Sequence, residues 1–343
     1  MSPRINPLVL TLLLSALTLL PGALFAQGEV NVYSARQEAL IKPLLDEFTD
    51  KTGIRVNLVT AKAGALLQRL RSEGRNSPAD LMITVDAGNL HNAREAGVLQ
   101  PVESDILDAA IPAQYRDPDN QWFSLSLRAR PIMVVDGQVG EGELSRYEDL
   151  AHERFSRRIC IRSSENVYNQ SMIAAMIVAN GEQETETWAR GLVANLARPP
   201  QGGDRDQIRA AAAGQCDIAI ANTYYLAQML AGDDAGDREA ASRIRVIWPN
   251  QDDRGAHVNV SGAGLVNTAP NRDNAVRLLE FLVSDSAQQW YAEANQEYPV
   301  KADVAWSETL QSLGEFRADE INMGLLGENN AAAVRLMDRA GWR

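Results

Sequence analysis

The sequence predicts an α/β protein made of two units that enclose a cleft. The chain has 343 residues, of which 45% are hydrophobic, so it is too long for one compact core and apolar enough to fill two. Short stretches with strand patterning alternate with longer helical segments, which indicates mostly parallel sheets with helices on both faces. No low-complexity tract or Pro/Gly-rich linker separates the halves. This continuity favours crossing segments between the two units.

The first unit opens with a strand and a helix. Residues 29–33 alternate as a strand with one buried face does. Apolar residues between 40 and 48 then recur at helical spacing, with Pro43 suited to the first turn and Gly53 suited to the end of the helix. The remaining pattern predicts a strand over 54–60, a helix around 66–70 and a strand over 80–85.

The second unit repeats this alternation. Gly181 is expected to end an apolar helix, and the crossings between the units are expected at 128–131 and at 255–264. The predicted elements are a strand over 158–162, a helix over 170–179, a strand over 217–221 followed at once by a helix, strands over 244–248 and 258–266, and amphipathic C-terminal helices.

The first 26 residues have the pattern of a secretory signal peptide. Arg4 precedes an apolar run over 8–20, and small residues lead to a cleavage site between Ala26 and Gln27. The alternative is a membrane anchor, but the run is short for a span of about 20 residues and a single charge flanks it. No cysteine near the cut offers a lipid attachment point. We therefore expect a soluble, exported protein.

The charge balance and the cysteines restrict the function classes. Lys and Arg number 33 against 45 Asp and Glu, a net charge of −12, which disfavours binding to nucleic acids and to anionic membranes. Cys160 and Cys216 are the two cysteines; an oxidising compartment favours a disulfide between them, and a pair of buried free thiols is the alternative. His91, His152 and His257 stand at no ligand spacing with them, which argues against zinc.

Two adjacent tyrosines are expected at the cleft. Ligands of open α/β sheets bind beyond the carboxyl ends of strands, where helices begin. Tyr224 and Tyr225 follow the strand predicted over 217–221, and Asn222 or Thr223 is a suitable N-cap. Both tyrosines therefore fall in the first helical turn, where the positive end of the helix favours a negative group such as a phenolate.

A third tyrosine falls at the start of another predicted helix. Tyr168 follows the strand over 158–162, and we expect Asn169 to cap the helix after it. Cys160 precedes Tyr168 by eight residues, and Cys216 precedes Tyr224 by the same interval. If the two strands are parallel neighbours, the cysteines meet at one level and the tyrosines meet at another.

Such a tyrosine cluster has two interpretations. The tyrosines either pack and cap their helices, or bind a hard trivalent cation through phenolate oxygens. A phenol has an ordinary pKa near 10, and a highly charged ion favours its deprotonated form. Magnesium and calcium ions are usually bound by carboxylate and carbonyl oxygens, without phenolate ligands. Ferric iron is therefore the metal that this cluster suits.

Several short motifs, taken together, resemble the periplasmic ferric-iron-binding proteins of ABC importers. Their order and spacing match the tyrosine-rich branch that includes the FutA proteins, over the whole mature chain. That resemblance implies a type II periplasmic-binding-protein fold, with two α/β lobes that close over a ligand in the cleft between them. Each lobe is expected to hold a mixed, mostly parallel sheet flanked by helices. The motifs are Val32-Tyr-Ser-Ala-Arg36, Ser77-Pro-Ala-Asp80, Thr84-Val-Asp-Ala87, Arg128-Ala-Arg130, Asn166-Val-Tyr-Asn-Gln170 and Asn222-Thr-Tyr-Tyr225.

The resemblance implies that Tyr168, Tyr224 and Tyr225 bind Fe(III) from the second lobe. The first-lobe ligands depart from the family pattern, because Gln37 and Glu38 stand where many relatives carry His-Tyr. Glu38 is a candidate carboxylate ligand, and an exposed acid at a helix start is its alternative role. Tyr33 is expected to pack beside the site or to lie in its outer shell, with metal ligation as the alternative.

Water or a synergistic anion, carbonate or citrate, is then expected to complete the coordination of the metal. Arg36 and Arg128 correspond to the family's anion-holding arginines, and a guanidinium fork matches a planar carboxylate or carbonate. Gln37 joins them as a residue around the anion. The alternative for Arg36 is an ordinary surface charge.

The function expected from this resemblance is capture of Fe(III) in the periplasm and its delivery to the permease of an ABC transporter, by a monomer with no catalytic activity. Lobe 1 is expected to comprise residues 27–128 and about 256–305, and lobe 2 about 129–255 and 306–343. One alternative is a binding protein for thiamine, a polyamine or an oxyanion. Another is an exported hydrolase, which the absence of Gly-x-Ser-x-Gly, His-Glu-x-x-His and a Gly-rich phosphate loop disfavours.

Overall fold

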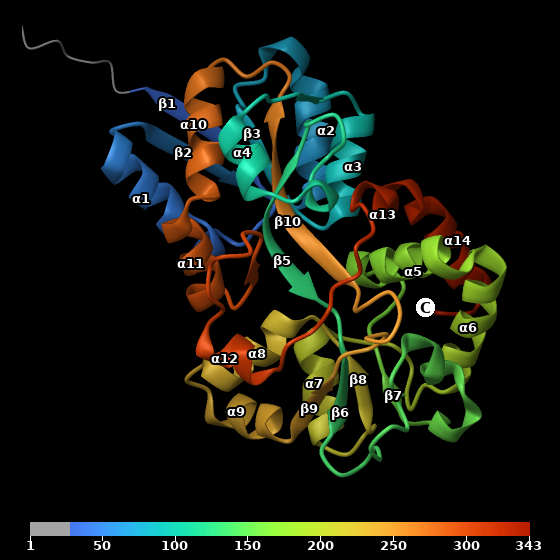
Figure 1. Ribbon diagram of the computed structural model, residues 1–343. Coiled ribbons are helices and arrows are strands. Elements are labelled where there is room, and N and C mark those ends of the chain that lie inside the picture. The colour runs from blue at the N-terminus through green and yellow to red at the C-terminus, as the bar shows by residue number, and fades with distance from the viewer. Residues whose placement is uncertain (1–27) are drawn as a thin grey trace, which may run out of the picture.

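The structure, a computed structural model, describes residues 28–343. Two β-sheets, each flanked by helices, lie one above the other in Figure 1. We call the larger sheet with its helices the first lobe, and the smaller sheet with its helices the second lobe. The signal peptide predicted over residues 1–26 lies outside the described residues.

The first lobe contains a seven-stranded sheet with the order β11-β5-β10-β3-β1-β2, in which β4 also pairs with β10. Its parallel register places Val32 beside both Leu58 of β2 and Leu81 of β3. The bounds of its strands are β1 Glu29–Ser34, β2 Arg55–Thr60, β3 Leu81–Val85, β4 Leu99–Gln100, β5 Phe123–Ala129, β10 Val258–Val266 and β11 Tyr298–Pro299.

The second lobe contains a four-stranded sheet with the order β7-β8-β6-β9. Its strands are short and almost wholly buried in β7, β8 and β6. Their bounds are β6 Ile132–Val135, β7 Ile159–Cys160, β8 Ile218–Ile220 and β9 Ile244–Ile247.

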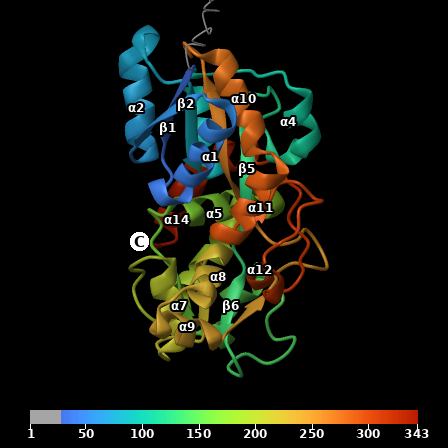
Figure 2. The same cartoon turned by 90° about the vertical axis from the view of Figure 1, so that its left-hand side faces the viewer.

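Helices cover both sheets, and Figure 2 shows α10 and α11 on the first lobe and α7 and α9 on the second. Short 3-10 turns at 38–40, 74–76, 113–115, 147–151 and 153–155 join other elements. The helices of the first lobe are α1 Lys42–Thr52, α2 Ala63–Glu73, α3 Ala87–Glu95, α4 Asp105–Ala110, α10 Arg272–Leu282 and α11 Asp285–Ala294. Those that follow in the second lobe and the C-terminal segment are α5 Val167–Asn180, α6 Glu182–Ala194, α7 Asp204–Ala212, α8 Thr223–Ala231, α9 Ala235–Ser242, α12 Glu308–Ser312, α13 Gly324–Glu328 and α14 Asn330–Arg339.

Both sheets are mixed, as predicted, but antiparallel pairs outnumber parallel ones, because the strands that carry the chain between the lobes run against their neighbours. β5 leaves the first lobe and β10 returns to it, so the two are antiparallel to each other. β10 is also antiparallel to β3, and β6 continues from β5 antiparallel to β8 and β9. The parallel pairs are β1 with β2, β1 with β3, and β7 with β8. As a result, the carboxyl ends of five strands face the space between the lobes, namely those of β1, β3, β5, β7 and β8.

The chain crosses where the sequence predicts. Residues 130–131 separate β5 from β6, which belong to different sheets, and β10 begins just after the second predicted crossing opens at Gly255. In the first lobe, Pro43 occupies the first turn of α1, and Gly53 ends that helix at a φ of 72°. A left-handed backbone of this kind favours glycine.

Cys160 and Cys216 form the predicted disulfide, with Cα atoms 6.0 Å apart. Cys160 lies in β7, and Cys216 lies just before β8, its parallel neighbour. The bridge therefore ties together the two strands that lead to the tyrosine-bearing helices α5 and α8.

The C-terminal segment contacts both lobes. α13 packs against α3 of the first lobe and α5 of the second, while α14 packs against α5 and α6. α12 packs against α8. None of the helices within residues 28–343 is both long and apolar enough to cross a membrane.

Candidate metal centre

A cavity of about 440 Å³ lies between the lobes, at the strand ends described above. Both lobes contribute to its wall, which contains most of the residues predicted to bind the metal or the anion. A larger groove of about 970 Å³, between α1, α4 and α10, contains none of them. The polar and aromatic lining of the interlobe cavity is Arg36, Gln37, Arg128, Tyr168, Arg205, Tyr224, Tyr225, Gln228 and Glu297.

The three predicted tyrosines converge in this cavity. The hydroxyl oxygens of Tyr168 and Tyr224 are 3.4 Å apart, and the ring centroids of Tyr224 and Tyr225 are 4.1 Å apart. Tyr168 lies in the first turn of α5, and Tyr224 and Tyr225 lie in the first turn of α8. Three phenol groups from two helix starts are thus directed into one space.

Burial makes Tyr224 and Tyr225 hard to ionise without a cation. It raises the pKa of Tyr224 well above 10, and the charges of Tyr168 and Tyr225 raise it further. Burial also raises the pKa of Tyr225 to about 12, again with a contribution from Tyr168. The nearby Arg128 guanidinium opposes the shift at Tyr224. Without a bound cation, both phenols are protonated at neutral pH.

The helix starts differ in two details from the prediction. Asn222 occupies the N-cap position of α8 as expected, but its side-chain oxygen accepts a hydrogen bond from Arg130 instead of capping the helix. Asn166, not Asn169, precedes the first residue of α5. Asn169 is buried within the first turn, where its amide donates to the backbone oxygens of Arg162 and Ser163. The expectation that Asn169 caps α5 is therefore wrong, because these loop contacts let the helix begin earlier.

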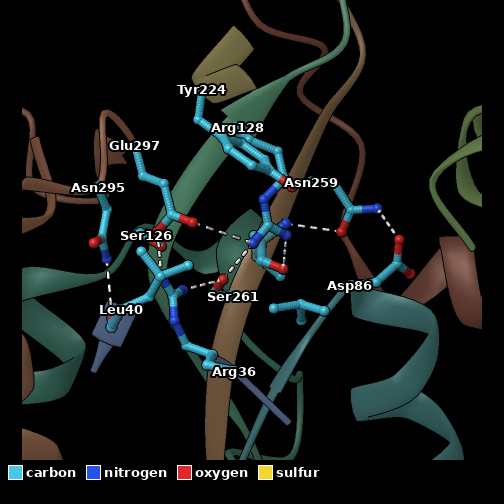
Figure 3. A network of polar contacts seen from close by, with 12 residues as sticks. Arg36, Leu40, Asp86, Ser126, Arg128, Tyr224, Asn259, Ser261, Asn295 and Glu297 are labelled. Atoms are coloured by element: carbon cyan, nitrogen blue, oxygen red, sulfur yellow. Dashed lines mark hydrogen bonds and ion pairs between the residues drawn. The ribbon is translucent and has the colours of Figure 1, made fainter. Parts of the chain in front are cut away.

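Arg36 and Arg128 form a buried cationic pair on the first-lobe side of the cavity (Figure 3). They are 3% and 2% exposed, so the alternative of a surface charge for Arg36 is wrong. Both donate to the hydroxyl of Ser261, and Arg128 also donates to the backbone oxygen of Val260. The Nε atom of each arginine has no hydrogen-bond partner.

Glu297 shares its carboxylate between the two arginines, and it was not among the residues predicted from sequence. Its Oε2 lies 3.0 Å from Arg36 Nη2, and its Oε1 lies 3.8 Å from Arg128 Nη2. Ser126 also donates to Oε2, at 2.5 Å. Two guanidinium groups and one carboxylate leave a net positive charge on this wall. Glu297 has no local motif around it; the pairing of β11 with β5 brings it to the arginines.

The remaining first-lobe candidates lie at different distances from the cavity. Gln37 lines it, whereas Glu38 is exposed in the 3-10 turn that follows and is not part of the lining. Tyr33 is buried, and its hydroxyl donates to both carboxylate oxygens of Glu73, at 2.9 and 3.1 Å. Desolvation and Glu73 both raise the pKa of this phenol. Tyr33 does not line the cavity.

Within residues 28–343, no group of three or more His, Cys, Asp or Glu side chains is arranged to hold a metal ion. The interlobe cavity offers three phenol oxygens instead, and its carboxylate, Glu297, is paired with the arginines.

Comparison with known proteins places the chain in a family. Residues 76–317 match the family described as bacterial extracellular solute-binding protein. The chain belongs to this family. Iron uptake protein A1 of Synechocystis is 47% identical over 317 residues, which cover 92% of this chain and 88% of that protein.

Solved structures of similar proteins share the whole fold of this solute-binding protein. The structure of Trichodesmium FutA (IdiA) in complex with iron and citrate has a TM-score of 0.89 at 48% identity, and covers 92% of this chain and 100% of that chain. A ferric binding protein from Campylobacter jejuni has a TM-score of 0.87 at 39% identity, with the same coverage. These similarities confirm the predicted resemblance and the two-lobe type II fold.

The lobes of this solute-binding protein also touch beside the cavity, through Asp86. Asp86 follows β3 and caps α3 by accepting from the Gly88 amide at 2.9 Å. From the second lobe, Ser171 of α5 donates to Asp86 at 2.7 Å. Asn259 of β10, in the first-lobe sheet, also donates to it, at 2.8 Å (Figure 3). Burial raises the pKa of Asp86 to about 6. Asp86 stands in the Thr84-Val-Asp-Ala87 motif, but no pattern in the sequence predicts its contact between the lobes.

Proposed function

We propose that this chain is a periplasmic solute-binding protein that captures Fe(III) between its lobes and delivers it to an ABC importer. The observation that carries the proposal is the convergence of three phenol groups in a cavity that also holds a buried arginine pair. Related proteins of the family are named for iron uptake and ferric iron binding, and one structure contains iron and citrate.

The charges of the site suit a ferric ion with an anion. Deprotonated Tyr168, Tyr224 and Tyr225 would neutralise the three positive charges of Fe(III). The two arginines and Glu297 leave one positive charge on the opposite wall. A carbonate or citrate there would accept hydrogen bonds from guanidinium groups and supply the oxygens that complete the coordination of the metal.

The proposed ligand set therefore omits two earlier candidates. Tyr33 is engaged with Glu73, away from the cavity lining, and Glu38 is exposed outside it. We assign the metal to Tyr168, Tyr224 and Tyr225, with Arg36 and Arg128 holding the anion. Gln37, which lines the cavity, is placed near that anion.

The transport cycle follows from the two-lobe fold. Lobe 1 comprises residues 27–128 and about 256–305, and lobe 2 about 129–255 and 306–343, with the signal peptide over 1–26 directing export to the periplasm. The protein acts as a monomer and binds its cargo without catalysing a reaction. The ion stabilises the closed arrangement because it binds that arrangement better than the open one. The closed form then docks on the permease.

A spectroscopic titration tests the proposal. Purified protein titrated with ferric citrate should develop a visible phenolate-to-iron charge-transfer band that saturates at one iron per chain. The double variant Tyr168→Phe/Tyr225→Phe should lose the band. Tyr33→Phe is the matched control and should keep it, because its hydroxyl lies at Glu73. Persistence of the band in the double variant would refute the assignment.

The same arginine pair favours one alternative cargo, an oxyanion bound without a metal, because both Nε atoms are buried without partners. Native mass spectrometry with inorganic phosphate and with ferric citrate separates the two cargoes. Stoichiometric phosphate retention without iron would favour the alternative.

A further inference from the structure

Arg130 lies at the crossing between the lobes, and none of the functions described above uses it. It follows β5 directly and precedes β6 in the other sheet. Its side chain is 1% exposed and forms a buried ion pair with Asp204, at 3.0 Å between Nη1 and Oδ2. Withdrawing a charge pair from water is costly, and good geometry with additional hydrogen bonds is needed to offset that cost.

The guanidinium of Arg130 reaches the first turns of two helices and the cap of a third. Nη1 donates to Asp204 at the start of α7 and, at 2.8 Å, to the side-chain oxygen of Asn222 before α8. Nη2 donates to the side-chain oxygen of Asn169 in α5, at 2.7 Å. The backbone amide of Asn222 also donates to Asp204, at 2.9 Å. One side chain thus connects the starts of all three helices.

These contacts adjoin the tyrosines in the chain. Asn169 is the residue after Tyr168, and Asn222 is two residues before Tyr224. A shift of either asparagine moves the helix start that carries the phenol. The 3.4 Å separation of the Tyr168 and Tyr224 hydroxyls therefore depends on the relative position of α5 and α8.

The backbone of Arg130 is held by the returning segment as well. Its amide donates to the His257 oxygen at 3.0 Å. The Tyr147 hydroxyl donates to the Arg130 oxygen at 2.8 Å and accepts from the His257 amide at 3.1 Å. Both crossing segments are therefore joined at the residue that holds the helix starts.

A guanidinium suits this position better than an ammonium. Its planar fork has five donors in fixed directions and serves several acceptors at once, whereas lysine presents a compact point charge on a flexible stem. Arg130→Lys keeps the charge beside Asp204 but cannot reproduce the separate bonds to Asn169 and Asn222.

We infer that Arg130 is a positioning residue for the metal site: it sets the geometry of the three phenol ligands from the crossing between the lobes. This inference rests on the proposed function, because it concerns how the same tyrosines meet the iron. It predicts that changes at Arg130 alter the iron complex in protein that is still folded.

The test compares Arg130→Lys, Arg130→Gln and Asn222→Ala with the wild-type protein. Arg94→Gln is the matched control, since Arg94 pairs with the buried Asp117 in the first lobe and does not line the cavity. Three quantities are measured: the midpoint of thermal unfolding, the Fe(III) affinity by competition with citrate, and the position of the charge-transfer band.

Both Arg130 variants should bind Fe(III) at least tenfold more weakly and shift the band, and Asn222→Ala should weaken binding several-fold. Arg94→Gln should lower the unfolding midpoint and leave the affinity and the band unchanged. Folded Arg130→Lys with wild-type affinity and band position would overturn the inference. If neither Arg130 variant folds, Asn222→Ala decides, and wild-type values in it overturn the inference. Absence of any band in the wild-type protein would instead overturn the proposed function, and the inference with it.

Discussion

Iron binding should release protons from the tyrosines, and the structure sets the size of the effect. The pKa of Tyr225 is raised to about 12 and that of Tyr224 lies well above 10, so both phenols carry their protons in the iron-free protein at neutral pH. Holding Tyr225 ionised at pH 7 costs about 7 kcal/mol, at about 1.4 kcal/mol per pH unit. Fe(III) must supply this energy.

The apparent affinity for Fe(III) should therefore rise about tenfold per pH unit for each phenol that binds as phenolate. Tyr224 and Tyr225 together give about a hundredfold rise per unit. Tyr225→Phe should lower the dependence by one factor of ten per unit, because one proton fewer is displaced.

The slope of the logarithm of the apparent Fe(III) affinity against pH is measured at pH 6, 7 and 8 by competition with a chelator whose protonation constants are known. The values are corrected for ferric hydrolysis. Calorimetric titration in buffers of different ionisation enthalpy counts the released protons independently. Tyr33→Phe serves as the control and should leave the slope unchanged. An unchanged slope in Tyr225→Phe, or a slope near zero in the wild-type protein, would refute phenolate coordination.

Three further predictions concern stability. Replacing Cys160 and Cys216 by serine opens a link across a sequence separation of 56 residues and should cost about 4 kcal/mol in the chain-entropy model; urea unfolding with and without reductant measures it, and equal midpoints would contradict it. Asp86 has a pKa raised from 3.8 to about 6 in the fold, so the folded state binds its proton more tightly than the unfolded state. The contribution of Asp86 to the free energy of unfolding is therefore most favourable below about pH 4 and declines by about 3 kcal/mol as the pH rises through 6. Urea unfolding between pH 4 and 7 should show this decline in the wild type relative to Asp86→Asn, and parallel curves would argue against a raised pKa. Gly262→Ala places a Cβ 2.7 Å from the backbone oxygen of Phe123 and should destabilise the protein by about 1–3 kcal/mol. An unchanged unfolding midpoint would show instead that the backbone of β10 shifts to accommodate the methyl group.

Most of the local structure and the tyrosine cluster were predictable from sequence. The eight-residue interval from each cysteine to its tyrosine predicted that both pairs meet if β7 and β8 are parallel neighbours. The structure contains that pairing, the disulfide and the 3.4 Å contact between Tyr168 and Tyr224. The helix starts depend on residues close together in the chain and were therefore predictable, whereas the parallel pairing of β7 with β8 entered the prediction as a condition that the tertiary structure meets.

The sequence by itself determined the alternation of strands and helices, the crossing points, the cysteine pair and the three tyrosines that meet at the cleft. These features follow from side-chain periodicity, from capping residues and from the backbone preferences of Gly and Pro, which act over one or two turns. Only the tertiary structure decided that β5 and β10 run against each other, that Tyr33 donates to Glu73, and that Glu297 joins Arg36 and Arg128. Those contacts link residues up to 261 positions apart. They depend on the order of strands in the sheet, which no short stretch of sequence encodes.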